Sequence, residues 1–294
     1  MQKFWPVLYG SVLAAEFLLF VLAPFVGWWL PANYCSFGPS VDNLFYLILA
    51  ITGATFVGTM IVFVWALLRY AARPGEKSQY THGSHKLEMV WTAVPAVTLL
   101  FIAFAQVKAW EHIKYVSRMP EPDQVFEVSA RQFEWRMRYP QPKTMDAIVS
   151  EWKKENKEPA SARDWERNRH FDDVHVVNDI HTWKGAKVRL YLKSRDVIHS
   201  FFLPNMRIKQ DALPGKVIPV WFDCDESNCS WDDTEKKLNV DRDKTWELAC
   251  AELCGWGHYR MHGRVYVHPD KADYERWLAN EWARQNTHQR QPQQ

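Results

Sequence analysis

The stretch NLFYLILAITGATFVGTMIVFVWALL, residues 43–68, contains no charged side chain and decides the first half of the fold. A bilayer core about 30 Å thick is crossed by about 20 apolar residues in a helix, so this stretch can span a membrane. A second stretch, MVWTAVPAVTLLFIAFAQ at residues 89–106, contains Pro95, which membrane helices tolerate where neighbouring groups satisfy the freed carbonyl. We therefore predict a transmembrane helical hairpin over residues 35–118.

The segment before this hairpin, residues 1–34, is also apolar and ends in Trp28, Trp29 and Leu30, as in an interfacial aromatic belt. A signal peptide with Lys3 at its basic end is the alternative. The apolar stretch that starts at Phe4 is long for a signal peptide, and no small-x-small cleavage site follows it. We predict an additional N-terminal transmembrane helix.

Basic residues set the expected orientation in the membrane. Arg69, Arg73, Lys77 and Lys86 all lie between the two hairpin helices, whereas residues 31–41 contain no Lys or Arg. By the positive-inside rule, the loop between the hairpin helices is cytoplasmic. We therefore place the chain beyond Lys108 outside the cytoplasm, and we predict a multi-pass protein of the bacterial inner membrane with a periplasmic domain.

Residues 119–270 are polar and charged but rich in short alternating segments. KVRLYLK at residues 187–193 alternates apolar and polar side chains, as in a half-buried strand, and residues 125–130, 217–222, 245–251 and 264–268 are similar. Pro219 assigns its segment to a sheet edge. Several short strands between turn residues predict an all-β, cupredoxin-like sandwich. The whole chain has 36 Lys and Arg against 34 Asp and Glu, so its bulk charge does not argue for nucleic acid as a partner.

Three segments interrupt the strand pattern. Residues near 141–169 are charge-rich and are predicted to be a solvated helix or loop, and residues near 223–243 are predicted to be an acidic inserted loop. Cys224 and Cys229 in this acidic loop form a disulfide, remain free thiols or hold an extra metal. The C-terminal segment, residues 271–294, is predicted to be a helix over 271–285 and a disordered tail.

The densest chemistry is CAELCGWGHYRM at residues 250–261. Two thiols, an imidazole and a thioether lie within this loop, and a second imidazole, His199, lies upstream. Soft sulfur ligands with imidazole select copper or zinc. A structural zinc bound by Cys250, Cys254, His258 and His199 would leave Met261 without a role, whereas copper sites use a weak Met ligand. Two thiols before the His and Met favour a pair of coppers over zinc or a disulfide.

These residues resemble subunit II of the haem–copper cytochrome c oxidases. The resemblance rests on HSFFLP at 199–204, DALPGK at 211–216 and C-A-E-L-C-G-x-x-H-x-x-M at 250–261, and it extends over nearly the whole chain. It implies a dinuclear copper centre, CuA, with bridging Cys250 and Cys254. It also implies that the remaining ligands are His199, His258, Met261 and the backbone carbonyl of Glu252. The Glu252 side chain would face a Mg²⁺ or Mn²⁺ shared with subunit I.

The resemblance also assigns four residues outside the metal centre. Glu88 in LEMVWTAVP would lie at the entrance of a proton path, or it is an interfacial carboxylate. Asp196 would help to dock cytochrome c, or it is a surface turn carboxylate. In QFEWRMRY, residues 132–139, Phe133 stands where the family has the Trp through which electrons enter, and Trp135 is kept. Basic side chains at 136 and 138 give a cationic cytochrome c a less negative surface, for which the acidic insertion is a possible replacement.

The implied function is that of subunit II of a proton-pumping cytochrome c oxidase. The chain would take electrons from cytochrome c and pass them to haem in subunit I, where O₂ is reduced to water. This chain holds no site for the oxygen chemistry. Two alternatives stay open at this point: the CuA subunit of a haem–copper nitric oxide reductase, and a membrane-anchored copper- or zinc-binding protein.

Overall fold

The computed structural model describes residues 4–289 except 72–74, 76, 78, 79, 81, 156 and 169. Its contacts divide the chain into two units, which are described separately. The membrane unit consists of residues 1–31 and 40–109, and the soluble unit consists of residues 32–39 and 110–294. The domain limits at residues 34, 118 and 270 stay predictions. Two residues named above lie outside the described residues: Lys3, the basic end of the alternative signal peptide, and Arg73, which was used to predict orientation.

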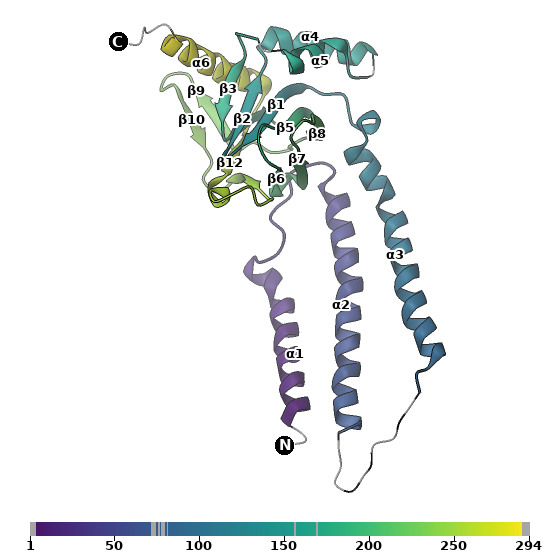
Figure 1. Cartoon of the computed structure of the whole chain (residues 1–294). Helices are drawn as coiled ribbons and strands as arrows, with labels where there is room; N and C mark the ends of the chain where they lie inside the picture. Colours follow the sequence, from purple (N-terminus) through teal and green to yellow (C-terminus); the bar gives the residue numbers. More distant parts are fainter. Residues whose placement is uncertain are drawn as a thin grey trace. The chain divides into compact units, whose positions relative to one another are not determined.

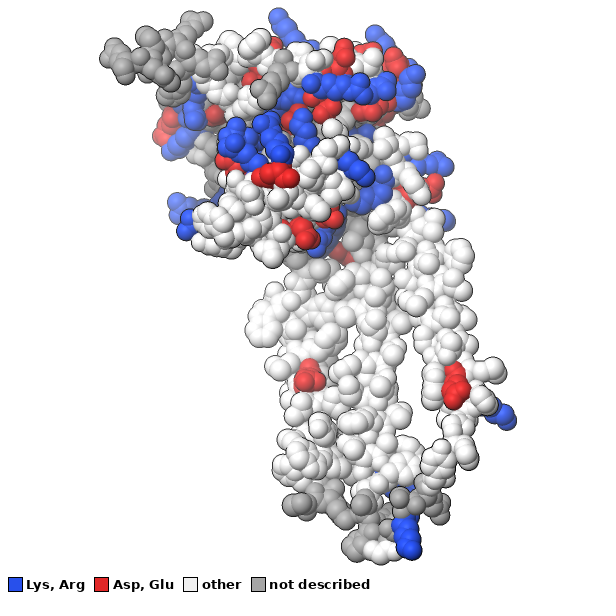
Figure 2. Space-filling model, in the orientation of Figure 1, with Lys and Arg blue, Asp and Glu red and all other residues white. Residues whose placement is uncertain are grey.

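Three long helices begin the chain (Figure 1): α1 is Phe4–Leu22, continued by the 3₁₀ turn Ala23–Val26, α2 is Gly38–Arg69 and α3 is His85–Lys114. All three are long and apolar enough to cross a membrane. Almost none of their side chains is buried within the structure, as expected of surfaces that face lipid. Figure 2 shows that charged side chains crowd the soluble half and are sparse on these helices. The apolar N-terminal segment therefore forms a helix, as predicted.

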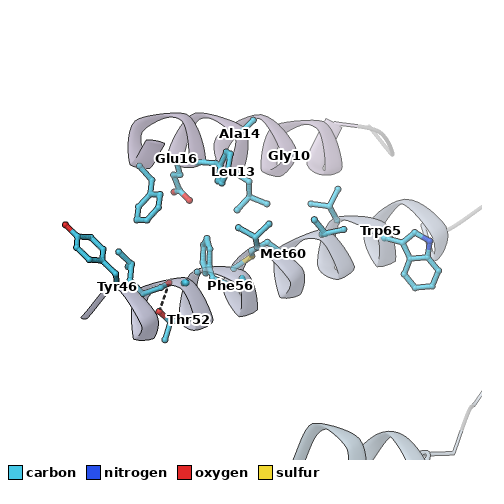
Figure 3. Close-up of a pocket in the computed structure, with 18 of the residues that line it drawn as sticks. Gly10, Leu13, Ala14, Glu16, Tyr46, Thr52, Phe56, Met60 and Trp65 are labelled. Atoms are coloured by element: carbon cyan, nitrogen blue, oxygen red, sulfur yellow. Dashed lines mark hydrogen bonds between the residues drawn. The ribbon is translucent and has the colours of Figure 1, made fainter. Parts of the chain in front are cut away.

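A groove of about 1340 Å³ lies between α1 and α2 and is lined almost entirely by apolar side chains. Figure 3 shows Glu16 of α1, and Phe56 and Met60 of α2, directed into the space between the two helices. The Thr52 hydroxyl, which also lines the groove, donates to the Ile48 carbonyl at 2.8 Å. Glu16 is the single charged residue of α1. A charged side chain in the middle of a membrane-spanning helix is energetically costly.

The soluble unit contains twelve strands among its described residues. They are β1 Gln124–Arg131, β2 Glu134–Tyr139, β3 Val174–Val177, β4 Asp179–Trp183, β5 Val188–Ser194, β6 His199–Leu203, β7 Ile208–Ala212, β8 Ile218–Phe222, β9 Cys229–Asp232, β10 Lys237–Val240, β11 Trp246–Cys250 and β12 His262–His268. Short 3₁₀ turns lie at Val116–Arg118, Pro204–Met206 and His258–Arg260.

Two five-stranded sheets form a sandwich. One has the order β3-β2-β1-β5-β8 and the other β4-β12-β11-β6-β7. Trp135 of β2 contacts Phe201 of β6 edge to face at 5.5 Å between ring centroids, and both side chains are fully buried, so this pair joins the two sheets. β8, with Pro219, lies at a sheet edge, which agrees with the prediction from sequence.

The described residues of the segment 141–169 are mostly helical, which is one of the two forms predicted, but they are not all solvated. They form α4, Pro142–Glu155, and α5, Ala160–Arg167. Met145, Ile148, Val149 and Trp152 are buried at the spacing i, i+3, i+4, i+7 of one helical face. The prediction of a solvated segment was wrong because the charged run hides this apolar stripe.

The acidic insertion is also not a simple loop. β9 and β10 pair antiparallel within it, and Trp231 of β9 is buried. Cys224 and Cys229 are both buried and free, so neither the disulfide nor an extra metal cluster is present among the described residues. The Cys224 thiol instead donates to the Glu226 carbonyl at 3.3 Å.

The terminal helix α6, Lys271–Gln289, continues four residues beyond the predicted end. Tyr274, Trp277 and Leu278 are buried, and the Trp277 ring stacks on the His181 imidazole at 3.6 Å. This packing anchors the helix against β4 and extends it into the predicted tail. The remaining tail, residues 290–294, lies outside the described residues.

Candidate metal centre

Three neighbouring strands of one sheet bring the distant ligand motifs together. His199 begins β6, Cys250 ends β11, and Met261 directly precedes β12. In the β6–β11 pairing, Cys250 lies opposite Phe201, and the Ala251 N–H donates to the Ser200 carbonyl at 2.9 Å. The antiparallel register therefore places His199 beside the 250–261 loop.

Backbone hydrogen bonds close the 250–261 loop at its base. The Cys250 N–H donates to the Met261 carbonyl at 3.1 Å, and the His258 N–H donates to the Gly255 carbonyl at 3.1 Å. Gly255 has φ +134°, a backbone conformation that side chains rarely allow. The turn therefore requires glycine at 255, and it points the Cys254 and His258 side chains back toward Cys250.

All six predicted donors lie around the two sulfurs. The Cys250 and Cys254 Sγ atoms are 3.9 Å apart. Cys250 Sγ is 3.9 Å from His199 Nδ1 and 3.2 Å from the Glu252 carbonyl oxygen. Cys254 Sγ is 3.5 Å from His258 Nδ1 and 3.8 Å from Met261 Sδ. Each thiol thus contacts one imidazole and one weaker donor.

This donor set suits a soft metal ion. A disulfide needs about 2.05 Å between its sulfurs, so the 3.9 Å separation rules out the disulfide alternative. Two thiolates 3.9 Å apart can both bind one ion, because each metal–sulfur bond is about 2.3 Å long. The ligand atoms of His199, Cys250 and Cys254 all lie within 4.8 Å of one another, so this group can hold a metal.

The two thiols differ in acidity. Burial raises the pKa of Cys250, but hydrogen bonds with His199 and the surrounding backbone outweigh it and lower the pKa to about 6. Burial, and then the neighbouring Cys250 charge, raise the pKa of Cys254 to about 12. At neutral pH the first thiolate is therefore ready to bind a metal, and the second forms when a metal cation replaces its proton.

Asp196 contacts a predicted metal ligand. Its Oδ1 atom lies 2.8 Å from His199 Nε2, and its Oδ2 atom accepts the Gln132 N–H at 2.6 Å. Burial disfavours the charged carboxylate, but the Gln132 N–H and the His199 imidazole together lower the pKa of Asp196. Asp196 therefore orients the ring that presents Nδ1 to the sulfurs. Its predicted role in docking cytochrome c stays a prediction.

The aromatic residues predicted to receive electrons flank the metal loop. Trp135 is fully buried, and its ring centroid lies 6.1 Å from that of His199. Phe133 contacts Trp256 of the loop at 5.2 Å between ring centroids. A Cβ atom on Gly257 would lie 2.5 Å from the Phe133 ring, so this close approach also requires glycine.

Sequence reasoning missed two residues of this neighbourhood. The Gln132 side-chain amide donates to the Cys254 carbonyl at 2.6 Å and so joins the β1–β2 turn to the metal loop. Trp256 is 80% exposed while its ring packs on Phe133. A large aromatic residue between two glycines of a ligand loop was the available signal for Trp256.

The two remaining predicted site residues are not tested by these contacts. Glu88 lies in the first turn of α3, with Oε2 at 3.1 Å from His85 Nδ1. The Glu252 side chain is exposed on the soluble unit, and only its carbonyl approaches the sulfurs. The proton-path and Mg²⁺ or Mn²⁺ assignments stay predictions.

Comparisons with known proteins cover both units. Residues 38–108 match the family model of the cytochrome c oxidase subunit II transmembrane domain, and residues 125–266 match that of its periplasmic domain. The chain is 26% identical to the alternative cytochrome c oxidase subunit 2 of Bradyrhizobium diazoefficiens, over 85% of this chain and 83% of the relative. It is 29% identical to the probable cytochrome c oxidase subunit 2 of Rickettsia bellii, over 81% of this chain and 77% of the relative.

A solved structure, the periplasmic domain of subunit II of the cytochrome oxidase of Bradyrhizobium japonicum, aligns with 56% of this chain and 97% of its own. The identity is 18% and the TM-score 0.39, so the assignment rests on the sequence matches instead. The membrane helices, the β-sandwich and the two matched domain models agree with one another: the chain belongs to the cytochrome c oxidase subunit II family.

Proposed function

We propose that this chain is the electron-accepting subunit of a haem–copper oxidase and that the 250–261 loop and His199 hold a dinuclear copper centre, CuA. The arrangement of donors carries the proposal. Two thiols lie 3.9 Å apart, each beside its own imidazole, with Met261 and the Glu252 carbonyl as further donors. When bound, such a centre supplies one-electron storage shared over two metals.

The protein contributes a fixed frame for that chemistry. His199 and Met261 are fully buried, and the strands β6, β11 and β12 hold the loop at both ends. Asp196 fixes the His199 ring, and Gln132 ties the Cys254 carbonyl to the β1–β2 turn. Ligands held in this way move little when the charge of the site changes, which favours fast electron transfer.

Met261 favours copper over zinc as the metal at this site. A zinc site would be complete with the two thiols and two imidazoles, and the thioether would be a core side chain. The Met261 Sδ atom instead lies 3.8 Å from Cys254 Sγ, in position as a weak further ligand. Weak thioether ligands are typical of copper electron-transfer sites, and they favour copper here.

The wider role follows from the family. Electrons from a cytochrome c would enter near Phe133 and Trp135, reach the copper centre and pass to haem in subunit I, where O₂ is reduced and protons are pumped. Glu88 would lie at a proton entrance, and the Glu252 side chain would bind Mg²⁺ or Mn²⁺ with subunit I. The soluble unit would lie on the periplasmic side of the bacterial inner membrane. The names of the relatives support an oxidase over a nitric oxide reductase.

Electron paramagnetic resonance of the full-length chain, purified in detergent and loaded with copper, tests the proposal. We expect two coppers per chain and a hyperfine pattern from one electron shared equally by two nuclei. The Met261→Leu variant should keep both coppers and change the hyperfine splitting. A single-copper spectrum, or tight binding of zinc without copper, would contradict the proposal.

A further inference from the structure

We propose that the electron donor of this protein docks through an acidic surface, onto a basic face that consists of Arg131, Arg136 and Arg195 around Phe133 and Trp256. The inference rests on the proposed function, because it names the charge of the partner that delivers the electrons. It reverses the sign expected from the sequence, where Asp196 and the acidic insertion were the docking candidates.

The β1–β2 turn supplies the first part of this basic face. Arg131 Nε lies 2.6 Å from Glu134 Oε1, and Arg136 Nε contacts the same oxygen. Two guanidinium groups therefore share one carboxylate and leave a net positive charge. Both Arg side chains are 42% exposed, while the Glu134 side chain is 25% exposed, so an approaching partner meets the positive groups first.

Arg195 supplies the second part. Its N–H donates to the Ala130 carbonyl at 3.0 Å and its Nε to the Ser129 hydroxyl at 2.9 Å, which places it beside the same turn. Within the described ranges no carboxylate neutralises the Arg195 guanidinium, which is exposed. The neighbouring Asp196 carboxylate keeps its negative charge and faces His199 and the Gln132 N–H. The three arginines against Glu134 and Asp196 therefore leave one net positive charge on this face (three minus two).

An apolar centre lies beside these arginines. Trp256 is 80% exposed and packs edge to face on Phe133, and Leu253 of the same loop is 77% exposed. Aromatic side chains rimmed by arginine are the usual composition of a protein–protein hot spot. The exposed ring of Trp256 also belongs to the ligand loop itself, so a partner seated on it would lie close to the metal ligands.

The positive charge continues across the outer face of the sheet. Arg136 and Arg195 both line a cleft of about 640 Å³ whose other lining residues include Arg167 and Lys193. Three acidic residues also line this cleft, but Arg138 binds Glu127 and Asp173, and Lys193 binds Glu127 and Glu166. The unneutralised charge at the cleft is therefore positive.

The acidic insertion is the competing candidate. Three of the eight carboxylates in residues 223–243 form ion pairs: Glu226 with Lys244, Asp233 with Arg276, and Glu235 with Lys237. By contrast, the segments that surround the metal loop, residues 129–136, 193–197 and 250–261, contain five basic and three acidic residues. Long-range attraction of a charged donor depends on the excess of basic over acidic residues around the metal loop.

The test uses one donor protein in two charge states. Native horse-heart cytochrome c is basic, and succinylation of its lysines makes it acidic while keeping the haem. Stopped-flow reduction of the purified oxidase complex by each form, at low and high salt, gives the ratio of their second-order rate constants. We expect the acidic form to react about tenfold faster at low salt, with the ratio falling toward one at high salt.

Variants locate the effect. Replacing Arg131, Arg136 and Arg195 with Gln should abolish the preference for the acidic form, and replacing them with Lys should keep it. Lys143, Lys154 and Lys184, which are exposed elsewhere on the soluble unit, provide the matched triple Gln control and should not change the ratio. Faster reaction of the basic form, or a ratio unchanged in the arginine variant, would overturn the inference. The same experiment separates this inference from the proposed function. If the proposed function is wrong, the complex accepts electrons from neither form of cytochrome c and also not from ascorbate with a small mediator.

Discussion

Replacing Asp196 with Asn tests whether this carboxylate holds a copper ligand in place. Both carboxylate oxygens accept hydrogen bonds: Oδ1 from the Val197 N–H at 2.7 Å and from His199 Nε2 at 2.8 Å, and Oδ2 from the Gln132 N–H at 2.6 Å. An Asn amide has one oxygen and one N–H₂ group. In either orientation, its N–H₂ group faces a donor that the carboxylate now accepts.

The size of the effect follows from these contacts. A hydrogen bond to a charged group contributes about 1.5–3 kcal/mol, and each 1.4 kcal/mol is a factor of ten in affinity. The Asp196 side chain is 30% exposed, so water replaces part of the loss and the lower value applies. We expect copper affinity to fall about tenfold, within the range known for residues that orient metal-binding imidazoles.

The assay is a competition titration of full-length protein in detergent against a copper chelator at constant pH. Asp225→Asn, an exposed carboxylate in the acidic insertion, is the matched control and should leave the affinity unchanged. An Asp196→Asn affinity within twofold of the wild type would refute the reasoning. A slower reaction with cytochrome c at unchanged copper affinity would instead assign Asp196 to docking.

Three further perturbations follow from the same structure. Arg138→Gln removes the cation that Glu127 and Asp173 share, and these two side chains are 4% and 1% exposed. The variant should lower the free energy of unfolding by about 3–5 kcal/mol in a urea titration, and an unchanged free energy of unfolding would show that water solvates these charges. Gly257→Ala, whose Cβ atom would meet the Phe133 ring, should alter the copper hyperfine pattern, whereas Gly53→Ala, with open space around its Cβ position, should not. Burial raises the pKa of Asp179 from 3.8 to about 6, so the folded state binds the extra proton and stability should fall as pH rises between these values. In Asp179→Asn, the free energy of unfolding should fall less steeply between pH 4 and pH 7. An equal dependence on pH in the variant and the wild type would contradict this reasoning.

The sequence was sufficient for features that depend on local composition. The uncharged run at 43–68 predicts a membrane helix because the cost of burying charge in lipid leaves few alternatives. Alternation in 187–193 predicts a strand for a similar reason, and β5 spans Val188–Ser194. By contrast, a helix was one of the two forms predicted for α4, but its buried face was missed because charged residues lie among the four buried side chains and dominate a count of composition.

The prediction of a loop for the acidic insertion was wrong for a different reason. Its two strands, Cys229–Asp232 and Lys237–Val240, do alternate apolar and polar residues, but each has only four residues, which is too short for the alternation to stand out in the sequence. Trp231 is buried there because its backbone N–H donates to Asp273 of α6 at 2.9 Å and its ring packs within the same unit. The sequence near Trp231 does not indicate this contact, because its partner lies 42 residues away.

The proposed copper ligands and the proposed docking surface differ in how far a motif can predict them. Ligands on one short loop must reach a common centre, so their spacing is restricted by chain geometry, and the contacts of Cys250, Cys254, His258 and Met261 agree with that spacing. A docking surface is a sum of charges from separate segments, and each charge counts only after its partners are known. Asp196 illustrates the difference: the sequence predicts a docking carboxylate, and only the structure shows its hydrogen bond to His199 and the Arg195 side chain beside it, which has no carboxylate partner among the described residues. The partner's charge must therefore be derived from the paired and unpaired groups in the structure, even where the ligands can be predicted from the motif.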